Sequence, residues 1–208
     1  MATLVSHSKT RQHILRAALR HFANSGYAAA SVQQIVDDAR VSKPALYYHF
    51  KDKAGLFQAL VSEAHDKEFE LLREAAARSK TIRGQLVEIL AVLFDYFREN
   101  RELMRIALAT MFGSPGELPK TLRYLDRCER NFEFIHTLMK RALQNGELDG
   151  RFGSRELAFG FYGQANVHLM AHLVTPTCRL DRRTANRIVG LFLAGAARKR
   201  NAGSPGKF

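Results

Sequence analysis

Side chains that can donate hydrogen bonds to an anion gather in residues 42–53 of this chain. Lys43, Tyr47, Tyr48 and His49 fall within about two turns of a predicted helix. An ammonium, a phenol and an imidazole can all donate to phosphate oxygens, and a lysine can also reach the acceptors on a guanine edge. This combination of residue types favours a nucleic acid as the partner of the segment.

Two short helices joined by a tight turn are predicted to position these side chains. Ser31 can cap a helix over 32–39, and Ser42 can cap a second helix over 43–50. Pro44 falls in the first turn of the second helix, where its missing N–H costs little. This arrangement is typical of the helix-turn-helix, whose second helix enters the major groove of DNA. The residues expected in its core are Phe22, Ile35, Val41, Leu46 and Phe50.

Apolar residues recur at helical spacing along almost the whole chain, and no segment alternates with period two. The sequence therefore predicts an all-α protein of about nine helices. Gly26 is expected to end the first helix as a left-handed cap. The predicted helices cover residues 10–24, 32–39, 43–50, 52–79, 83–98, 101–111, 120–144, 155–174 and 181–197.

The net charge of +12 and the sequence pI of about 10.1 favour polyanionic partners. Residues 1–53 hold eight Lys and Arg against three Asp and Glu, and residues 198–208 form a basic tail predicted to be disordered. The two cysteines have no CxxC spacing, which indicates a reducing compartment without a zinc ribbon. No signal peptide and no transmembrane helix is predicted, so we expect a cytoplasmic protein.

The first 60 positions resemble the tetracycline-repressor (TetR) family of bacterial transcriptional regulators, without a gap in order or spacing. The resemblance implies a homodimer with an N-terminal DNA-reading head, a C-terminal effector domain, and an interface made by the last two helices. The matching residues are Arg11, Ile14, Ala17, Ala18, Phe22, Gly26, Tyr27, Ser31, Val32, Ile35, Ala39, Val41, Ser42, Lys43, Leu46, Tyr47, Phe50, Lys53 and Leu56.

Two features depart from the family pattern. Arg40 stands in the turn where the family often has Gly, so a backbone φ above zero would strain it. Asp37 and Asp38 put two negative charges beside a surface expected to face DNA, and they should point away from phosphate.

The resemblance also assigns roles within the head. Tyr47 and His49 match positions that contact phosphate in the family. Chemistry and position, apart from the resemblance, suggest that Lys53 in the first turn of the fourth helix would add a phosphate contact. On the same grounds, Lys43, Ala45 and Tyr48 would contact base edges, because they lie near the start or on the outward face of the helix over 43–50. The alternative for Tyr47 is a half-buried core residue. The complete set of DNA-binding candidates is Ser31, Ser42, Lys43, Ala45, Tyr47, Tyr48, His49 and Lys53.

Aromatic, methionine and polar residues of the predicted helices between 83 and 174 could line an apolar pocket for a small molecule. The alternative is an ordinary helical core. His168 and His172 lie four residues apart but lack a third metal ligand at helical spacing, so no metal and no cofactor is predicted. The pocket candidates are Phe94, Phe97, Met104, Met111, Phe132, Met139, Phe161, Gln164 and His168.

These observations predict a ligand-responsive repressor. Residues 1–53 would bind DNA, 54–197 would bind the ligand and dimerise, and 198–208 would be the tail. The homodimer would place two reading helices about 34 Å apart on a palindromic operator, and an apolar or aromatic small molecule would release it. The alternatives are a DNA-binding activator or architectural protein without an effector, an enzyme, for which the sequence offers no nucleophile–base pair, and a basic membrane binder.

Overall fold

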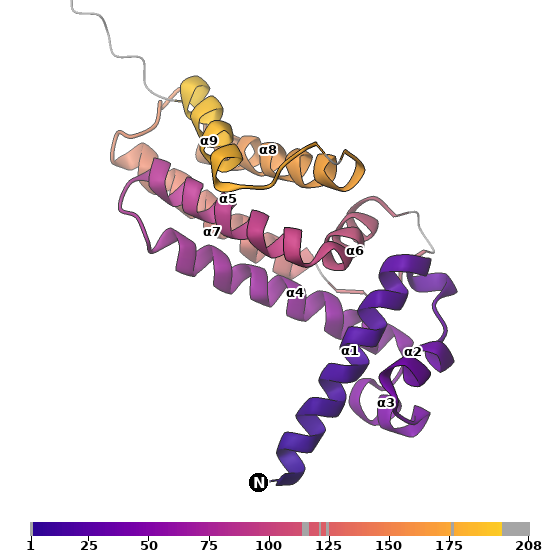
Figure 1. The fold of residues 1–208 in the computed structure, drawn as a ribbon. Coiled ribbons are helices and arrows are strands. Elements are labelled where there is room, and N and C mark those ends of the chain that lie inside the picture. The colour runs from indigo at the N-terminus through magenta and orange to yellow at the C-terminus, as the bar shows by residue number, and fades with distance from the viewer. Residues whose placement is uncertain (1, 114–116, 121, 124, 176, 197–208) are drawn as a thin grey trace, which may run out of the picture. The chain divides into compact units, whose positions relative to one another are not determined.

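The computed structural model describes residues 2–113, 117–120, 122–123, 125–175 and 177–196. Within these ranges the chain forms nine helices and no strand, which confirms the predicted all-α class. In chain order they are α1 (Ala2–Ala29), α2 (Val32–Ala39), α3 (Lys43–Phe50), α4 (Lys53–Ala76), α5 (Ile82–Glu99), α6 (Arg101–Phe112), α7 (Leu125–Gln144), α8 (Ser154–Val174) and α9 (Arg182–Ala196) (Figure 1). The predicted basic tail lies outside the described residues.

The predicted bounds of α2 and α3 are confirmed, whereas the ends of other helices differ, by five residues at the end of α1 (Ala29 against 24) and by one residue at several others. Three further differences have a local reason. Helix α1 begins at Ala2 and not near residue 10, because no Gly or Pro interrupts the first nine residues. Helix α4 ends at Ala76 and not near 79, where the Arg78 amide bonds to a carbonyl only three residues back. Helix α7 begins five residues later than predicted, because Leu122 N–H donates to Pro119 O in a turn.

Gly26 interrupts α1 near its end. Its φ of 76° and ψ of 165° are not helical, and they lie in a region that is almost exclusive to glycine. The predicted break at this residue is confirmed, although ψ is extended and not that of a left-handed helical cap. The Ala30 amide then bonds to Gly26 O at 3.2 Å, which closes the last short turn.

Replacing Gly26 by Ala is expected to lower the free energy of unfolding by about 1–3 kcal/mol. The new Cβ would meet nothing within 4 Å, so the cost comes from the backbone angle and not from a clash. Urea unfolding would measure the effect. The exposed neighbour Ser25 replaced by Ala is the control, and an equal result for both variants would contradict the backbone explanation.

The chain divides into two compact units, Met1–Glu70 with Tyr96–Glu129, and Leu71–Asp95 with Arg130–Phe208. We call them unit 1 and unit 2. Unit 1 contains α1, α2, α3 and α6 complete, and α1 packs against both α2 and α6. The predicted DNA-reading head, which consists of α1, α2 and α3, therefore shares a unit with α6. The boundary at residue 53 between a DNA-binding and a ligand-binding domain stays a prediction.

A continuous hydrophobic core holds unit 1 together and fixes the back of α3. Leu46 and Phe50 of α3 enter it beside Ile14, Ile35 and Leu56. The rings of Phe22, Tyr27 and Phe57 meet at its edge, with centroids 5.0–5.9 Å apart. The core residues are Ile14, Leu15, Ala17, Ala18, Phe22, Ala30, Ile35, Val36, Ala39, Leu46, Phe50, Leu56, Phe57, Leu60, Val61 and Ile106.

In unit 2, α8 and α9 pack side by side (Figure 1). The Phe161 and Phe192 rings meet edge to face with centroids 5.9 Å apart. Arg182 of α9 binds the carboxylate of Glu88 on α5, and this bond lowers the pKa of Glu88. Across both units, none of the described helices has the length and apolar character needed to span a bilayer.

Candidate nucleic-acid interface

Side-chain caps set the start of each helix in the head. Ser31 Oγ accepts the Gln33 amide at 3.2 Å, and Ser42 Oγ accepts the Ala45 amide at 3.4 Å. Asp52 Oδ1 accepts the Gly55 amide at 2.6 Å at the start of α4. These bonds satisfy amides that the first helical turn leaves unpaired, so they define where α2, α3 and α4 begin.

Helix α3 has one buried and one exposed side. Leu46 is 0% exposed and Phe50 is buried with it, whereas Tyr47 is 45% exposed and Tyr48 is 75% exposed. Lys43 is also exposed, and Ala45 and His49 are half-buried. Tyr47 is therefore not a core residue. The exposed side of α3 presents an ammonium and two phenols to solvent.

Two cations flank α3 at backbone positions with positive φ. Arg40 has φ 54° and ψ 47°, in the left-handed helical region, and Lys51 has φ 67° and ψ −49°. In the described part of the chain they are the only non-glycine residues with positive φ. The strain foreseen for Arg40 is confirmed. The positive φ of Lys51 was not foreseen, because a lysine in a sequence does not indicate a left-handed backbone. Both side chains are exposed.

The two acidic residues of α2 are engaged within the head. Asp38 Oδ2 accepts from Arg20 Nη2 of α1 at 2.9 Å. Asp37 Oδ1 accepts from Gln33 Nε2, one turn earlier on α2, at 2.7 Å. The ion pair with Arg20 thus offsets the negative charge of Asp38. The hydrogen bond from Gln33 holds the Asp37 carboxylate against its own helix.

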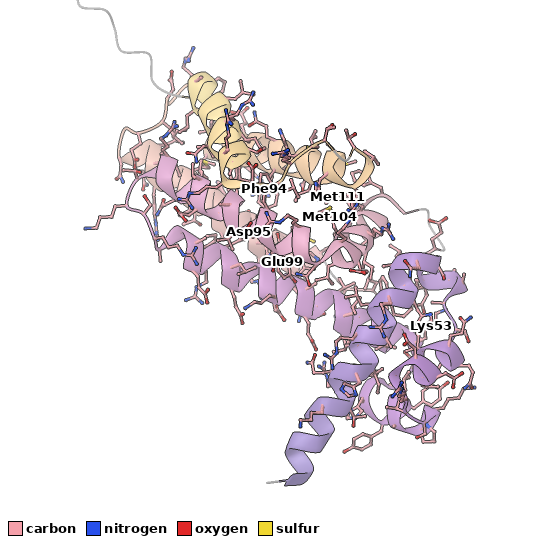
Figure 2. The ribbon with its side chains drawn as sticks, viewed as in Figure 1. Lys53, Phe94, Asp95, Glu99, Met104 and Met111 are labelled. Atoms are coloured by element: carbon pink, nitrogen blue, oxygen red, sulfur yellow. The ribbon has the colours of Figure 1, made fainter. Side chains whose placement is uncertain are left out.

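Lys53 contacts the protein and not only solvent (Figure 2). Its Nζ donates to Ala28 O at 3.0 Å and lies 4.6 Å from the centroid of the Tyr27 ring. Burial lowers the pKa of Lys53, and burial together with the charge of Asp52 raises the pKa of Tyr27. Lys53 therefore joins the start of α4 to the end of α1, while its ammonium keeps donor hydrogens for a phosphate.

The pocket candidates are divided between the units. Phe97, Met104 and Met111 belong to unit 1, and Met111 is exposed on α6 (Figure 2). The other six belong to unit 2, where Phe94, Met139 and Phe161 are buried and Phe132, Gln164 and His168 are half-buried.

Polar groups on α8 differ in how they are satisfied. His168 Nδ1 lies 2.8 Å from Gln164 O, and His172 Nδ1 lies 2.7 Å from Cys178 O. Gln164 Oε1, in contrast, is buried without a hydrogen-bond partner. Among the residues that the structure describes, no group of three His, Cys, Asp or Glu could hold a metal ion.

A serine–histidine–carboxylate chain joins α7 to the first turn of α8. Ser154 Oγ lies 2.8 Å from His136 Nε2, and His136 Nδ1 lies 2.9 Å from Glu133 Oε2. Hydrolases use this order of groups. Here Arg155 Nη1 also donates to Glu133 at 2.7 Å, and the bonds from His136 and Arg155 lower the pKa of Glu133. The sequence did not reveal the contact between Ser154 and His136, because 18 residues and a loop separate them.

Comparisons with known proteins identify the head. The family described as bacterial regulatory proteins, tetR family, matches residues 14–60. The HTH-type transcriptional regulator AcrR of Shigella flexneri is 44% identical over 191 residues, which cover 89% of this chain and 88% of AcrR. These matches are to transcriptional regulators and not to enzymes.

Solved structures share the fold of most of the chain. The fatty acid degradation regulator FadR from Bacillus halodurans has a TM-score of 0.80 at 17% identity, over 89% of this chain and 95% of that one. FadR from Bacillus subtilis in complex with stearoyl-CoA has a TM-score of 0.78 at 18% identity, over 88% of this chain and 98% of that one. Together with the head and the likeness to AcrR, these findings establish that the chain belongs to the TetR family of DNA-binding transcriptional regulators.

Proposed function

We propose that the protein is a cytoplasmic, ligand-responsive repressor that binds a palindromic operator as a homodimer. The exposed side of α3 carries this proposal, because Lys43, Tyr47 and Tyr48 project from a helix whose other side is anchored in the core. Lys43 in the first turn would read a base edge, and Tyr47 would donate to phosphate. Arg40 and Lys51 join the predicted contacts as candidates for the DNA backbone.

An exposed apolar stripe on α8 and α9 supports the homodimer. We call it the α8–α9 stripe, and its members on α8 follow one another at helical spacing, as a single face requires. Exposed apolar side chains so arranged are typical of a surface that a second copy covers. The stripe consists of Phe159, Val167, Met170 and Val174 on α8 and Leu191 on α9.

Gln164 supports a small-molecule effector in unit 2. A buried oxygen without a partner is uncommon, and a hydrogen-bond donor on a ligand would satisfy it. Its neighbour one turn earlier, Phe161, is buried and apolar. The FadR structure with stearoyl-CoA is a precedent in this fold for a ligand with a long apolar acyl chain. We therefore propose an apolar or aromatic ligand that carries one donor group. Its differential affinity for two states of the dimer would weaken operator binding.

The operator would be found by selection of bound DNA fragments, followed by titration at several salt concentrations. We expect log Kobs to fall linearly with log salt, with a slope of about −0.9 for each phosphate neutralised. A single preferred palindrome should emerge. Binding without sequence preference and without a salt slope would contradict the proposal.

Replacing Lys43 by Ala is expected to relax preference at one base position of each half-site, by about 1–3 kcal/mol. Binding to the other positions should keep its pattern, because the remaining contacts are unchanged. The measurement is a comparison of affinities for single-base variants of the operator. Lys80, an exposed lysine outside the head, provides the matched control. An identical base preference in the Lys43 and Lys80 variants would refute the assignment.

A further inference from the structure

A thiol, an imidazole and a carboxylate form a chain inside unit 1, away from the DNA-facing side chains. Cys128 Sγ of α7 lies 3.5 Å from His65 Nε2 of α4. On the other side of the ring, His65 Nδ1 lies 3.5 Å from Glu68 Oε2, three residues further along α4. Opposite nitrogens make the two contacts, so the imidazole stands between the thiol and the carboxylate.

The contacts of His65 favour its protonated form. Burial opposes the charge, but the hydrogen bonds and negative charges of Cys128 and Glu68 outweigh burial and raise the pKa of His65 to about 9. An imidazole in hydrogen-bond contact with a sulfur can take the proton of the thiol, which generates the nucleophilic thiolate. The neighbouring carboxylate holds the imidazolium in place, as the third member of a cysteine–histidine–carboxylate arrangement does.

The second cysteine provides a comparison within the same molecule. Cys178 is half-exposed, as Cys128 is. Its Sγ donates to the carbonyl oxygen of His168 at 3.7 Å. The sulfur of Cys178 is thus in contact with a neutral acceptor, whereas that of Cys128 is in contact with an imidazole. The two cysteines are thus both partly buried and differ in the group that contacts the sulfur.

We propose that Cys128 is a reactive thiol that adds electrophiles of the α,β-unsaturated carbonyl class, and that the adduct lowers operator affinity. In this addition a bond forms between Sγ and the β-carbon of the electrophile. The π electrons of the C=C bond move to the α-carbon, which takes a proton from His65 Nε2. The product is a thioether, and the proton balance closes because the thiol first gave its proton to the ring. No oxidant or reductant is required.

The contacts around Cys128 indicate how an adduct on its sulfur would affect the DNA-reading head. Helix α4 is joined to the segment before and within α7 by paired bonds between Gln58 and the Arg123 backbone, at 2.6 and 2.8 Å, and by an ion pair between Asp66 and Arg127 at 3.3 Å. Earlier on α4, Leu56 shares the core with Leu46 of α3. A group bonded to Sγ would push α7 from α4 and strain a helix whose start lies beside the DNA-facing side chains.

The first experiment measures the rate of alkylation of each cysteine by N-ethylmaleimide at neutral pH, by mass spectrometry of peptides from the native protein. We expect Cys128 to react faster than Cys178, on the order of tenfold or more. His65→Gln should remove the difference, whereas His136→Gln, a change at a half-buried histidine of unit 2, should leave it. Equal rates in the unaltered protein, or an unchanged ratio in His65→Gln, would overturn the reactive thiol.

The second experiment measures operator affinity before and after alkylation, and it rests on the proposed function. We expect affinity to fall about tenfold or more in the unaltered chain and in Cys178→Ser, and to stay constant in Cys128→Ser. Complete adduct formation at Cys128 with unaltered affinity would overturn the regulatory half of the proposal. Absence of sequence-specific binding before alkylation would instead overturn the proposed function, and the rates of the first experiment would still decide the chemistry.

Discussion

Leu46→Ala is expected to lower the free energy of unfolding by about 2–5 kcal/mol, the usual cost of deleting a buried leucine side chain. Leu46 is 0% exposed and meets residues of α1, α2 and α4 in the core of unit 1. The cavity would lie directly behind the exposed side of α3. Urea unfolding followed by circular dichroism would measure the loss, and operator affinity should fall with it because α3 would no longer be held.

Tyr48→Ala is the matched control on the same helix. Tyr48 is 75% exposed, so its removal should change the unfolding free energy by only about 0.5 kcal/mol or less. Operator affinity should nevertheless fall, because a predicted base contact is lost. If Leu46→Ala unfolded at the same urea concentration as Tyr48→Ala, the two-sided description of α3 would be wrong.

Val167→Glu and Leu191→Glu are each expected to dissociate the proposed homodimer. Both side chains belong to the α8–α9 stripe and are more than half exposed in the single chain. A carboxylate placed in an apolar interface loses its hydration without gaining a partner, at a cost on the order of several kcal/mol. Sedimentation equilibrium should show monomers, and operator affinity should fall because one head contacts only one half-site.

Leu125→Glu is the control for the dimer prediction. Leu125 is 68% exposed on α7 and Leu191 is 70% exposed on α9, so the two changes alter the isolated chain in the same way. Leu125 is not part of the stripe, and its variant should remain dimeric. Dimers of normal affinity in both stripe variants would show that another surface joins the two copies.

The parts of this fold that local chemistry determines could be predicted from the sequence. Ser31 and Ser42 cap helices where their types and positions indicated, and the starts of α2 and α3 follow from those caps. Leu46 and Phe50 are buried as their spacing required. The break at Gly26 was also foreseen, because glycine alone suits such a backbone angle.

The parts that depend on distant contacts could not be predicted in this way. The bond from Lys53 to Ala28 joins residues 25 apart, and the thiol–imidazole contact joins residues 63 apart. A pattern of helical spacing carries no information about which faces of two such helices meet. The same limit applies to α6, whose packing on α1 is a property of the folded unit and not of its own periodicity.

The positive φ angles of Arg40 and Lys51 bear on how this head would respond to redesign. Glycine would adopt both angles without strain, so a protein engineer seeking to relieve strain at the ends of α3 would turn to it first. Each such replacement would also delete a positive charge at a side chain that lies in solvent. Relief of backbone strain and electrostatic attraction to a polyanion are thus opposed at these two positions, and this chain has a cation at each of them.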